Sequence, residues 1–414
     1  MITESTKANE IRKTIKGQQI QLAGPSTRAV HANRRSNPYQ SIGEPIVQTA
    51  TYQFKDSADL TDFMEANLWG KSPERTEYGR YGNPTITAVE KRLAGLENAE
   101  DAILFSSGMA AITTVLLAIL PSGANIVMTD DCYRQTRQFC KTFLKRLGIS
   151  CTVVPMGDYD ALDNAINPNT RLLISETPTN PYLRVLDIER FVSIAKKHKV
   201  KTFVDATFAT PLNIRPLDWG VDLVVHSATK YLGGHNDILA GVVAGKSNII
   251  EGLRGTLGVL GAISDPHSAS LLLRGIKTLG LRIAQQNLNG LKVSQFLESH
   301  NKIEQVWYPG LPSHPDYLIA EEQMNGFGGV VSFTVKGDLD TASKLIDLFE
   351  IPLIAASFGG VESLVEQPAL MSYYELSTEE RLFLGISNNL VRLSLGIEDT
   401  NDLIADLEQA LERI

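Results

Sequence analysis

Short, almost continuous apolar runs alternate with amphipathic stretches through the middle of the chain. Seven of these runs have the length and β-branched content of buried strands: 102–105, 125–128, 151–154, 172–174, 202–204, 223–225 and 241–244. Strands that are apolar on both faces and separated by helices are typical of a mostly parallel sheet with helices on both sides. The pattern therefore predicts an α/β domain built on a mostly parallel seven-stranded sheet.

The pattern changes after Ser264. The elements expected beyond it are a long helix at 271–297, a strand at 330–335, a helix at 339–349, a Gly/Ser-rich turn region at 355–363 and a last amphipathic helix at 401–414. Helices and strands that do not interleave regularly favour a smaller α+β domain. We place the sheet domain at 81–288 and this C-terminal domain at 289–414.

Residues 1–80 are expected to form an extended N-terminal arm. The stretch 25–80 has little periodicity apart from a possible helix at 61–66, and so long an irregular region should serve something outside its own subunit. The first forty residues hold seven basic residues and two acidic ones. Such a segment is either a subunit-clasping arm or an organelle-targeting peptide, and its low serine content favours the arm.

Composition limits the partners of the chain. The 414 residues include 39 Lys+Arg and 47 Asp+Glu, a net charge of −8, so we expect neither nucleic acid nor an anionic membrane as partner. No window approaches the roughly twenty apolar residues of a membrane span. Three cysteines without a CxxC pair indicate a reducing compartment, which we take to be the cytoplasm. The seven histidines lack metal-ligand spacing, so no metal is expected.

The most specific segment follows the run 223–225. There Ser227, Thr229 and Lys230 place two hydroxyls and an amine at the C-terminal end of a strand, the end at which ligands bind in open α/β sheets. This set suits a phosphate next to a reactive carbonyl. A lysine among apolar residues loses hydration of its charged form, so its pKa should fall and leave an amine able to form a Schiff base.

Four further segments could complete a site around Lys230. Asp205 ends an apolar strand, and its carboxylate could hold a protonated pyridine nitrogen. Gly108 and Met109 begin a helix whose N–H groups could approach a phosphate. Asn180 and Tyr133 follow two other strands, where an amide could reach a ring hydroxyl and a phenol could stack on a ring. Each of these residues alone also fits a plain turn, cap or core position.

Order and spacing of these motifs resemble one family over nearly the whole chain. Asp205-x-Thr207, the run from Ser227 to His235, the run from Tyr78 to Pro84 and the run from Val391 to Ser394 are similar to those of the transsulfuration enzymes of cysteine and methionine metabolism. These enzymes depend on pyridoxal 5′-phosphate (PLP). The resemblance implies the PLP fold type I, an aspartate aminotransferase-like architecture.

The resemblance also implies a role for each site residue. Lys230 would be the Schiff-base lysine and the base that moves protons, and Tyr133 and Tyr78 would be further catalytic residues. The cofactor would be held by Gly108, Met109, Tyr133, Asn180, Asp205, Thr207, Ser227, Thr229, Lys230, Tyr78 and Arg80. The substrate, a small amino acid, would be held by Arg392, Ser357 and Tyr133. Tyr78 and Arg80 would reach the site of a neighbouring subunit, which implies a homotetramer with active sites shared between two chains.

Within this family the chain is most similar to the plant-type cystathionine γ-synthases. That similarity implies a transferase that replaces the γ-substituent of an O-activated L-homoserine with L-cysteine and releases cystathionine. Two departures keep alternatives open: Gln135 stands where the plant type has a lysine, with Arg134 or Arg137 as a substitute cation, and Ala356 stands where other branches have a glutamate.

The main alternative is therefore a PLP-dependent C–S lyase of the cystathionine or methionine γ-lyase type. The same alternative includes a second possibility, a γ-substituting enzyme of a secondary pathway. Two different classes fit less well. A non-catalytic protein of this fold would not need the Lys230, Asp205, Tyr133 and Arg392 set, and a dinucleotide-binding dehydrogenase should have a GxGxxG turn after an early strand, which is missing.

Overall fold

The computed structural model describes residues 23–33, 37–69 and 75–414. Its larger sheet has seven strands in the order β1-β7-β6-β5-β4-β2-β3. These strands are β1 (Asp101–Phe105), β2 (Asn125–Thr129), β3 (Ser150–Val154), β4 (Thr170–Glu176), β5 (Lys201–Asp205), β6 (Leu223–Ser227) and β7 (Gly241–Gly245). Only β7 runs antiparallel to its neighbours, β1 and β6. The predicted mostly parallel seven-stranded sheet is confirmed.

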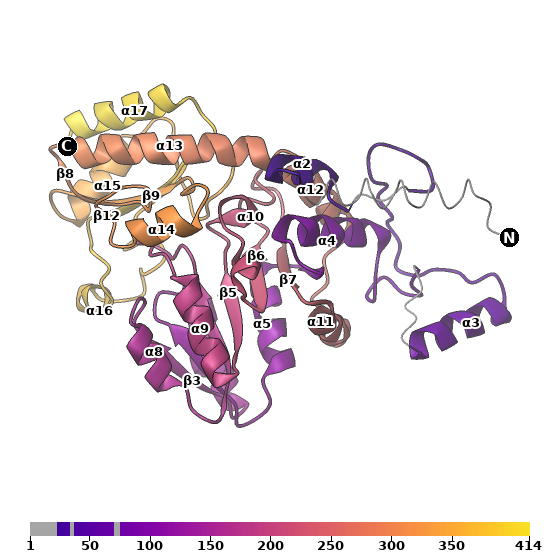
Figure 1. The fold of residues 1–414 in the computed structure, drawn as a ribbon. Coiled ribbons are helices and arrows are strands. Elements are labelled where there is room, and N and C mark those ends of the chain that lie inside the picture. Colours follow the sequence, from indigo (N-terminus) through magenta and orange to yellow (C-terminus); the bar gives the residue numbers. More distant parts are fainter. Residues whose placement is uncertain (1–22, 34–36, 70–74) are drawn as a thin grey trace.

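Alternation along each strand places apolar side chains on both faces of this sheet. In β4, Ile174 packs with the helices of one face, whereas Leu173 packs with those of the other. Buried residues of the first face pack with α5 (Gly108–Ile119), α7 (Leu144–Arg146) and α11 (Ser247–Leu260). The second face is covered by α4 (Pro84–Glu97), α8 (Tyr159–Ala165), α9 (Ile188–His198) and α12 (Pro266–Lys277). The result is a three-layer α/β domain (Figure 1).

Short elements fill the connections of the larger domain. They are α6 (Arg134–Gln138), the π-helical turn η1 (Phe139–Phe143), α10 (Thr210–Asn213) and the 3₁₀ turn η2 (Pro216–Trp219). Together α6, η1 and α7 form one continuous helical segment directly after Tyr133. Because that segment begins at the end of β2, it starts at the edge of the sheet where the C-terminal ends of the parallel strands meet.

A second sheet of five strands, in the order β10-β11-β12-β9-β8, forms the core of the C-terminal region. Its strands are β8 (Ile303–Trp307), β9 (Val330–Val335), β10 (Leu353–Ile354), β11 (Leu364–Glu366) and β12 (Leu390–Ser394). Its helices are α14 (Tyr317–Gln323), α15 (Leu339–Asp347), α16 (Thr378–Phe383) and α17 (Thr400–Glu412). The expected smaller α+β unit is confirmed, and Figure 1 shows α13 and α17 running along one side of it.

One expectation was wrong: the helical pattern at 271–297 is two helices. Helix α12 ends at Lys277 and α13 (Leu279–Ser299) begins two residues later. The Arg282 guanidinium donates hydrogen bonds to the carbonyl oxygens of Gly275 (2.8 Å) and Tyr231 (2.7 Å). The N–H and the hydroxyl of Thr278, the residue at the break, also donate to the Gly275 carbonyl (both 3.1 Å), so the last turn of α12 is closed by Thr278 and Arg282 together.

Helix α13 belongs to both hydrophobic cores. Leu279 and Ile283 pack in the core of the larger domain, whereas Val293 and Leu297 pack in the core of the C-terminal region. The predicted domain boundary at residue 288 falls inside this helix.

The N-terminal arm contains two described helices, α2 (Pro25–His31) and α3 (Ser57–Leu68). Helix α2 packs against α4, α12 and α13, whereas α3 projects away from the main body (Figure 1). Leu68 and Trp69 at the end of α3 expose about three quarters of their surface. Most of the basic N-terminal segment, predicted to be an arm or a targeting peptide, lies outside the described residues.

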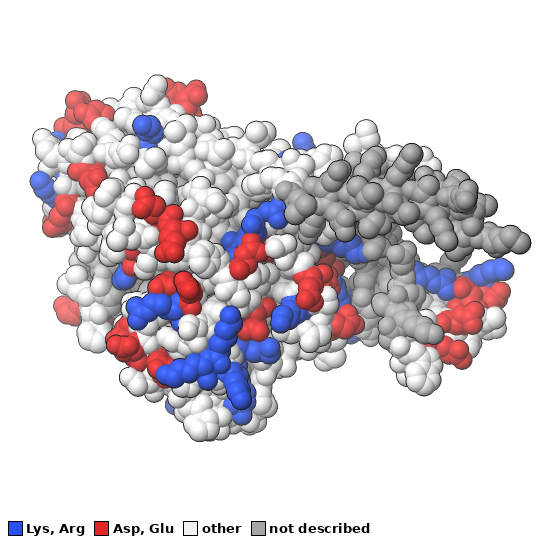
Figure 2. All heavy atoms as spheres, viewed as in Figure 1, with Lys and Arg blue, Asp and Glu red and all other residues white. Residues whose placement is uncertain are grey.

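The surface mixes charges of both signs. Figure 2 shows basic and acidic side chains interspersed over the face in view. Among the described residues, no helix has the length and hydropathy needed to cross a bilayer.

Candidate active site

Lys230 lies in the turn after β6 and points toward the second sheet. Its Nζ donates a hydrogen bond of 2.7 Å to Oγ of Ser357, a residue 127 positions later in the chain. Burial, with a smaller contribution from the Arg392 charge, lowers the pKa of Lys230 to about 8. At this pKa a larger share of the amine is uncharged than in an ordinary lysine, and the uncharged form is nucleophilic and can accept a proton.

Asp205 is held in place at the end of β5 by Thr207. Its Oδ1 accepts hydrogen bonds from the backbone N–H (2.9 Å) and the hydroxyl (2.5 Å) of Thr207. The Thr207 hydroxyl oxygen also accepts a hydrogen bond from the N–H of Ser227 (2.8 Å), which connects the ends of β5 and β6. Burial raises the pKa of Asp205, so a cation beside it would stabilise its charged form.

A small cradle lies where α5 begins. Ser107 caps the helix by accepting a hydrogen bond from the N–H of Ala110 (3.0 Å). Gly108 lies so close to β6 that a Cβ added there would be 2.9 Å from Cβ of Ser227. Next to it, Met109 continues the helix, and its sulfur accepts a hydrogen bond from Thr136 (3.9 Å). Free N–H groups at the start of a 12-residue helix favour an anion such as a phosphate.

Thr229 is engaged with the chain itself. Its hydroxyl donates to the carbonyl of Ala240 (3.2 Å) and accepts from the N–H of the same residue (3.0 Å). The hydroxyl therefore fixes the turn that carries Lys230.

Arg392 comes from β12 of the second sheet and reaches the loop after β4. Its Nη1 donates to Oδ1 of Asn180 (2.9 Å) and lies 3.0 Å from Oε1 of Glu366. Its Nη2 donates to the carbonyl of Ser357 (3.0 Å), whereas its buried Nε has no hydrogen-bond partner among the described residues. A buried guanidinium with an unused N–H suits a carboxylate ligand.

Aromatic rings border the amine and the guanidinium. The Phe358 ring centroid lies 5.2 Å from Lys230 Nζ and 5.6 Å from the guanidinium carbon of Arg392. Phe358 stacks on Phe208 with a centroid distance of 4.0 Å. These rings keep water from one side of the two cations, so the electrostatic interactions there are stronger than in solution.

Tyr133 is placed by Glu176, a residue that the sequence analysis did not single out. The N–H of Tyr133 donates to Oε2 of Glu176 (2.7 Å), and the Tyr133 side chain remains exposed. Glu366, the partner of Arg392, was also missed. A sequence signal for Glu176 was present, because it ends an apolar strand as Asp205 does. Glu366 has no such signal, since it meets Arg392 only through the register of β11 and β12.

The remaining predicted residues lie on the arm. The Arg80 guanidinium donates to the carbonyl of Gly258 (2.7 Å) and lies over the rings of Tyr78 and Tyr81. Tyr78 pairs with Thr51 through an isolated β-bridge and keeps an exposed ring. Within the described chain, these bonds hold the arm against α11 rather than against Lys230.

The two arginines considered as substitutes for the missing lysine have partners of their own. Arg134 donates to the carbonyl of Ser372 (2.6 Å) and pairs with Glu375. Arg137 donates to the carbonyl of Asp130. Gln135 lies between them on α6 and is exposed.

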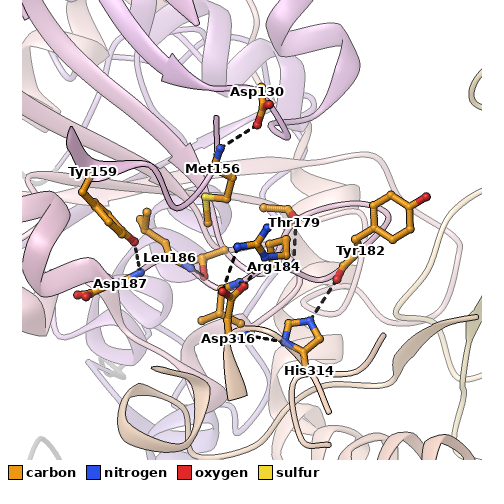
Figure 3. Close-up of polar contacts among 12 residues, drawn as sticks. Asp130, Met156, Tyr159, Thr179, Tyr182, Arg184, Leu186, Asp187, His314 and Asp316 are labelled. Atoms are coloured by element: carbon orange, nitrogen blue, oxygen red, sulfur yellow. Dashed lines mark hydrogen bonds and ion pairs between the residues drawn. The ribbon is translucent and has the colours of Figure 1, made fainter. Parts of the chain in front are cut away.

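Charged contacts fasten the loop that carries Asn180 to the C-terminal region (Figure 3). Arg184 forms a bidentate pair with Asp316, with distances of 2.6 and 3.1 Å, and the N–H of Val185 donates to the same carboxylate (2.9 Å). His314 lies 3.3 Å from the carbonyl of Tyr182 on the other side of the loop. These contacts anchor the chain a few residues after Asn180, which accepts the hydrogen bond from Arg392.

Comparisons with known proteins agree with this geometry. The family of Cys/Met metabolism PLP-dependent enzymes matches residues 26–412. The chain belongs to this family. It is 48% identical to cystathionine gamma-synthase 1, chloroplastic, of Arabidopsis thaliana over 95% of this chain and 70% of that protein. It is 39% identical to L-methionine gamma-lyase of Fusobacterium nucleatum over 96% of this chain and 100% of that enzyme. The crystal structure of metB from Corynebacterium glutamicum superposes with a TM-score of 0.87 at 37% identity, over 94% and 98% of the two chains.

The residues of this PLP-dependent family member fit its cofactor. The cradle that a Cβ at Gly108 would fill suits the phosphate, and Lys230 supplies an amine for the aldehyde. Asp205 is the carboxylate available to the ring nitrogen, and Tyr133 offers an exposed ring for stacking. The predicted fold type I and the dependence on PLP are confirmed, whereas the individual roles of the site residues stay predictions.

Proposed function

We propose that the chain replaces the γ-substituent of an O-activated L-homoserine with L-cysteine and releases cystathionine. The observation that carries the proposal is the contact of Arg392 with Ser357, whose hydroxyl also binds Lys230. A carboxylate-binding guanidinium and a proton-accepting amine therefore flank the same residue. An α-amino acid held by its carboxylate at Arg392 would have its Cα near Lys230.

In this proposal each residue of the chain has a separate task. When bound, PLP withdraws electrons from the substrate carbons, with Asp205 stabilising the charged ring nitrogen. Lys230 is the base for the protons at Cα and Cβ, one at a time, and gives a proton back to each carbon at the end. Because one amine holds only one extra proton, the first must leave it before the second is accepted. Arg392 orients the substrate through its carboxylate, and Asn180 and Glu366 fix the guanidinium. Phe358 excludes water from the amine.

A γ-lyase is the second candidate. The 39% identity to L-methionine gamma-lyase over the full length of that enzyme supports it. Both reactions begin with the same proton transfers, and they differ in what reaches Cγ after the leaving group departs. The larger identity to the plant enzyme supports replacement.

The deciding experiment is mass spectrometry of the products. The purified enzyme is offered O-phospho-, O-acetyl- and O-succinyl-L-homoserine, each with and without L-cysteine. Replacement predicts cystathionine whenever cysteine is present. Release of 2-oxobutanoate at the same rate with and without cysteine would instead identify a lyase. Comparison of the three esters identifies the leaving group.

A homotetramer with shared active sites is part of the proposal. It is supported by the projecting helix α3, with its exposed Leu68 and Trp69, and by the exposed ring of Tyr78. Light scattering of the purified chain measures the mass. Arm-shared sites predict that an inactive Lys230→Ala chain and an inactive Tyr78→Phe chain regain activity when mixed and refolded together.

A cytoplasmic location also remains a proposal. The three cysteines are free in the structure, as expected for a reducing compartment. The Arabidopsis thaliana relative is named chloroplastic. Fractionation of the source cells, with the chain followed by antibody, distinguishes the cytoplasm from an organelle.

A further inference from the structure

Glu176 lies beside Asp205 at the C-terminal edge of the larger sheet. The two residues are register partners on the neighbouring parallel strands β4 and β5, so their backbones lie about 4.8 Å apart. Both line a cavity of about 10 Å³, together with Cys132 and Ile112 of α5. A cavity of this volume has room for a single water at most, and Glu176 is only 4% exposed, so little solvent lies between the two carboxyl groups.

Glu176 is also bonded to the backbone of Tyr133. The N–H of Tyr133 donates to Oε2 of Glu176 at 2.7 Å, immediately before α6 begins at Arg134. Tyr133 provides no side-chain cap for this helix, and the Glu176 carboxyl bonds the backbone from which the Tyr133 ring extends. The buried side chain of Glu176 therefore contacts Tyr133, which is expected to stack on the cofactor. It also lies next to Asp205, which is expected to hold the ring nitrogen of the cofactor.

The surroundings of Glu176 disfavour a second negative charge. Acidic groups act on it from two elements, Asp205 on β5 and Asp131 before α6, and the side chains of Cys132, Tyr133 and Tyr373 also interact with it. Arg137 is the cation that acts on it, and that guanidinium is bonded to a backbone carbonyl. Burial first, and then the Asp205 charge, raise the pKa of Glu176 well above its ordinary value.

We propose that Glu176 is a positioning residue of the active site: uncharged, it holds Tyr133 in place beside Asp205 and leaves the single negative charge of the pair on Asp205. The stacking ring and the carboxylate for the ring nitrogen are then fixed relative to each other by one side chain. The proposal deepens the proposed function, since it concerns the same cofactor site. It does not depend on which substrate the enzyme uses.

Three variants separate the two parts of this proposal. Glu176→Gln keeps an oxygen that can accept the Tyr133 N–H and carries no charge, like the protonated acid. Glu176→Met keeps most of the volume but removes the acceptor. Glu90→Gln is the matched control, because Glu90 is a buried carboxyl in the same domain that likewise accepts a backbone N–H, from Leu104 (2.9 Å).

The measurements use the enzyme without substrate. They are the dissociation constant of PLP from the apo-protein, the circular dichroism of the bound cofactor, and the pH midpoint of its visible absorption band. In Glu176→Gln we expect a dissociation constant within about threefold of wild type, an unchanged dichroism and an unchanged midpoint, and the same for Glu90→Gln. In Glu176→Met, loss of the bond to Tyr133 should weaken PLP binding at least about tenfold and reduce the dichroism.

Two results would overturn the proposal. If Glu176 is ionised, Glu176→Gln removes a negative charge next to Asp205 and lowers the pH midpoint by about one unit or more. If Glu176→Met retains both affinity and dichroism, Glu176 does not position Tyr133. Should Glu176→Met fail to fold, the midpoint of Glu176→Gln still decides the charge state on which the proposal rests. If the enzyme formed no cystathionine, the PLP dissociation constant, the dichroism and the pH midpoint could still be measured. The proposed γ-replacement and the proposed role of Glu176 can therefore fail independently.

Discussion

Lys230 and Ser357 join the two parts of the molecule through one hydrogen bond, 2.7 Å from Nζ to Oγ. Lys230 follows a strand of the larger sheet, and Ser357 lies between β10 and β11 of the smaller one. Ser357 has a backbone φ of +95°, a region that favours glycine. The amine is therefore positioned by a residue that holds an unfavourable backbone conformation.

This strain predicts an order of stability among Ser357 variants. Both Ser357→Gly and Ser357→Ala lose the hydrogen bond, but only glycine relieves the positive φ. Glycine should therefore be more stable than alanine by about 1 kcal/mol. Thermal unfolding of the two variants gives the comparison. Equal melting temperatures would show that the backbone at 357 relaxes without cost.

The amine of Lys230 should lose its proton at a lower pH than an ordinary lysine does. In the apo-protein its reductive methylation, followed by peptide mass spectrometry, should rise with pH with a midpoint near 8. The exposed Lys344 serves as the internal control for reagent reactivity. In Arg392→Met a neighbouring positive charge is gone, so the charged amine is less disfavoured and the midpoint should move to higher pH. A shift to lower pH would contradict the assigned cause.

Arg392 should act mainly on substrate affinity. Arg392→Lys keeps a positive charge but cannot reach Asn180, Ser357 and a substrate carboxylate at once. Loss of charge-assisted hydrogen bonds worth about 1.5–3 kcal/mol predicts a KM about 10- to 150-fold higher, with a smaller change in kcat. Steady-state kinetics with retained cofactor absorbance check this. An unchanged KM would place the carboxylate elsewhere.

Gly108 should be essential for cofactor affinity because of its close contact with β6. In Gly108→Ala the new Cβ would lie 2.9 Å from Cβ of Ser227, so the start of α5 must move away. We expect PLP to bind at least about tenfold more weakly, as measured by equilibrium dialysis. Gly252→Ala on α11 is the matched control, since a Cβ there meets nothing within 4 Å. It should raise helix stability by up to about 1 kcal/mol and leave affinity unchanged.

Asp316 should contribute to folding stability and to the order of the Asn180 loop. Asp316→Ala leaves the partly buried Arg184 guanidinium and the Val185 N–H without their carboxylate. Because the Arg184 side chain is 32% exposed, we discount the cost of a fully buried pair and expect a loss of about 2 kcal/mol. Denaturant unfolding measures it. A loss below about 0.5 kcal/mol, the level of an ordinary surface change, would contradict this role.

The sequence predicted the sheet well because its strands are buried on both faces and therefore apolar throughout, as β2 and β4 show. It did not predict the break between α12 and α13, since the apolar periodicity continues through Thr278, and the bonds of Thr278 and Arg282 that close α12 appear only in the folded chain. Site residues next to strand ends, such as Asp205 and Lys230, could be predicted from local motifs. Glu366 and the contact of Arg392 with Asn180 depend on pairing between segments far apart in the chain.

Helix α13, which contributes Leu279 and Ile283 to one core and Val293 and Leu297 to the other, limits how this protein can be divided for experiments. A fragment that stops at residue 288 would expose the apolar residues of the larger domain that pack against Val330 and Phe358. A fragment that starts there would begin in the middle of a helix. Neither half is suited to separate expression, so variants of the cofactor site are best studied in the full-length chain.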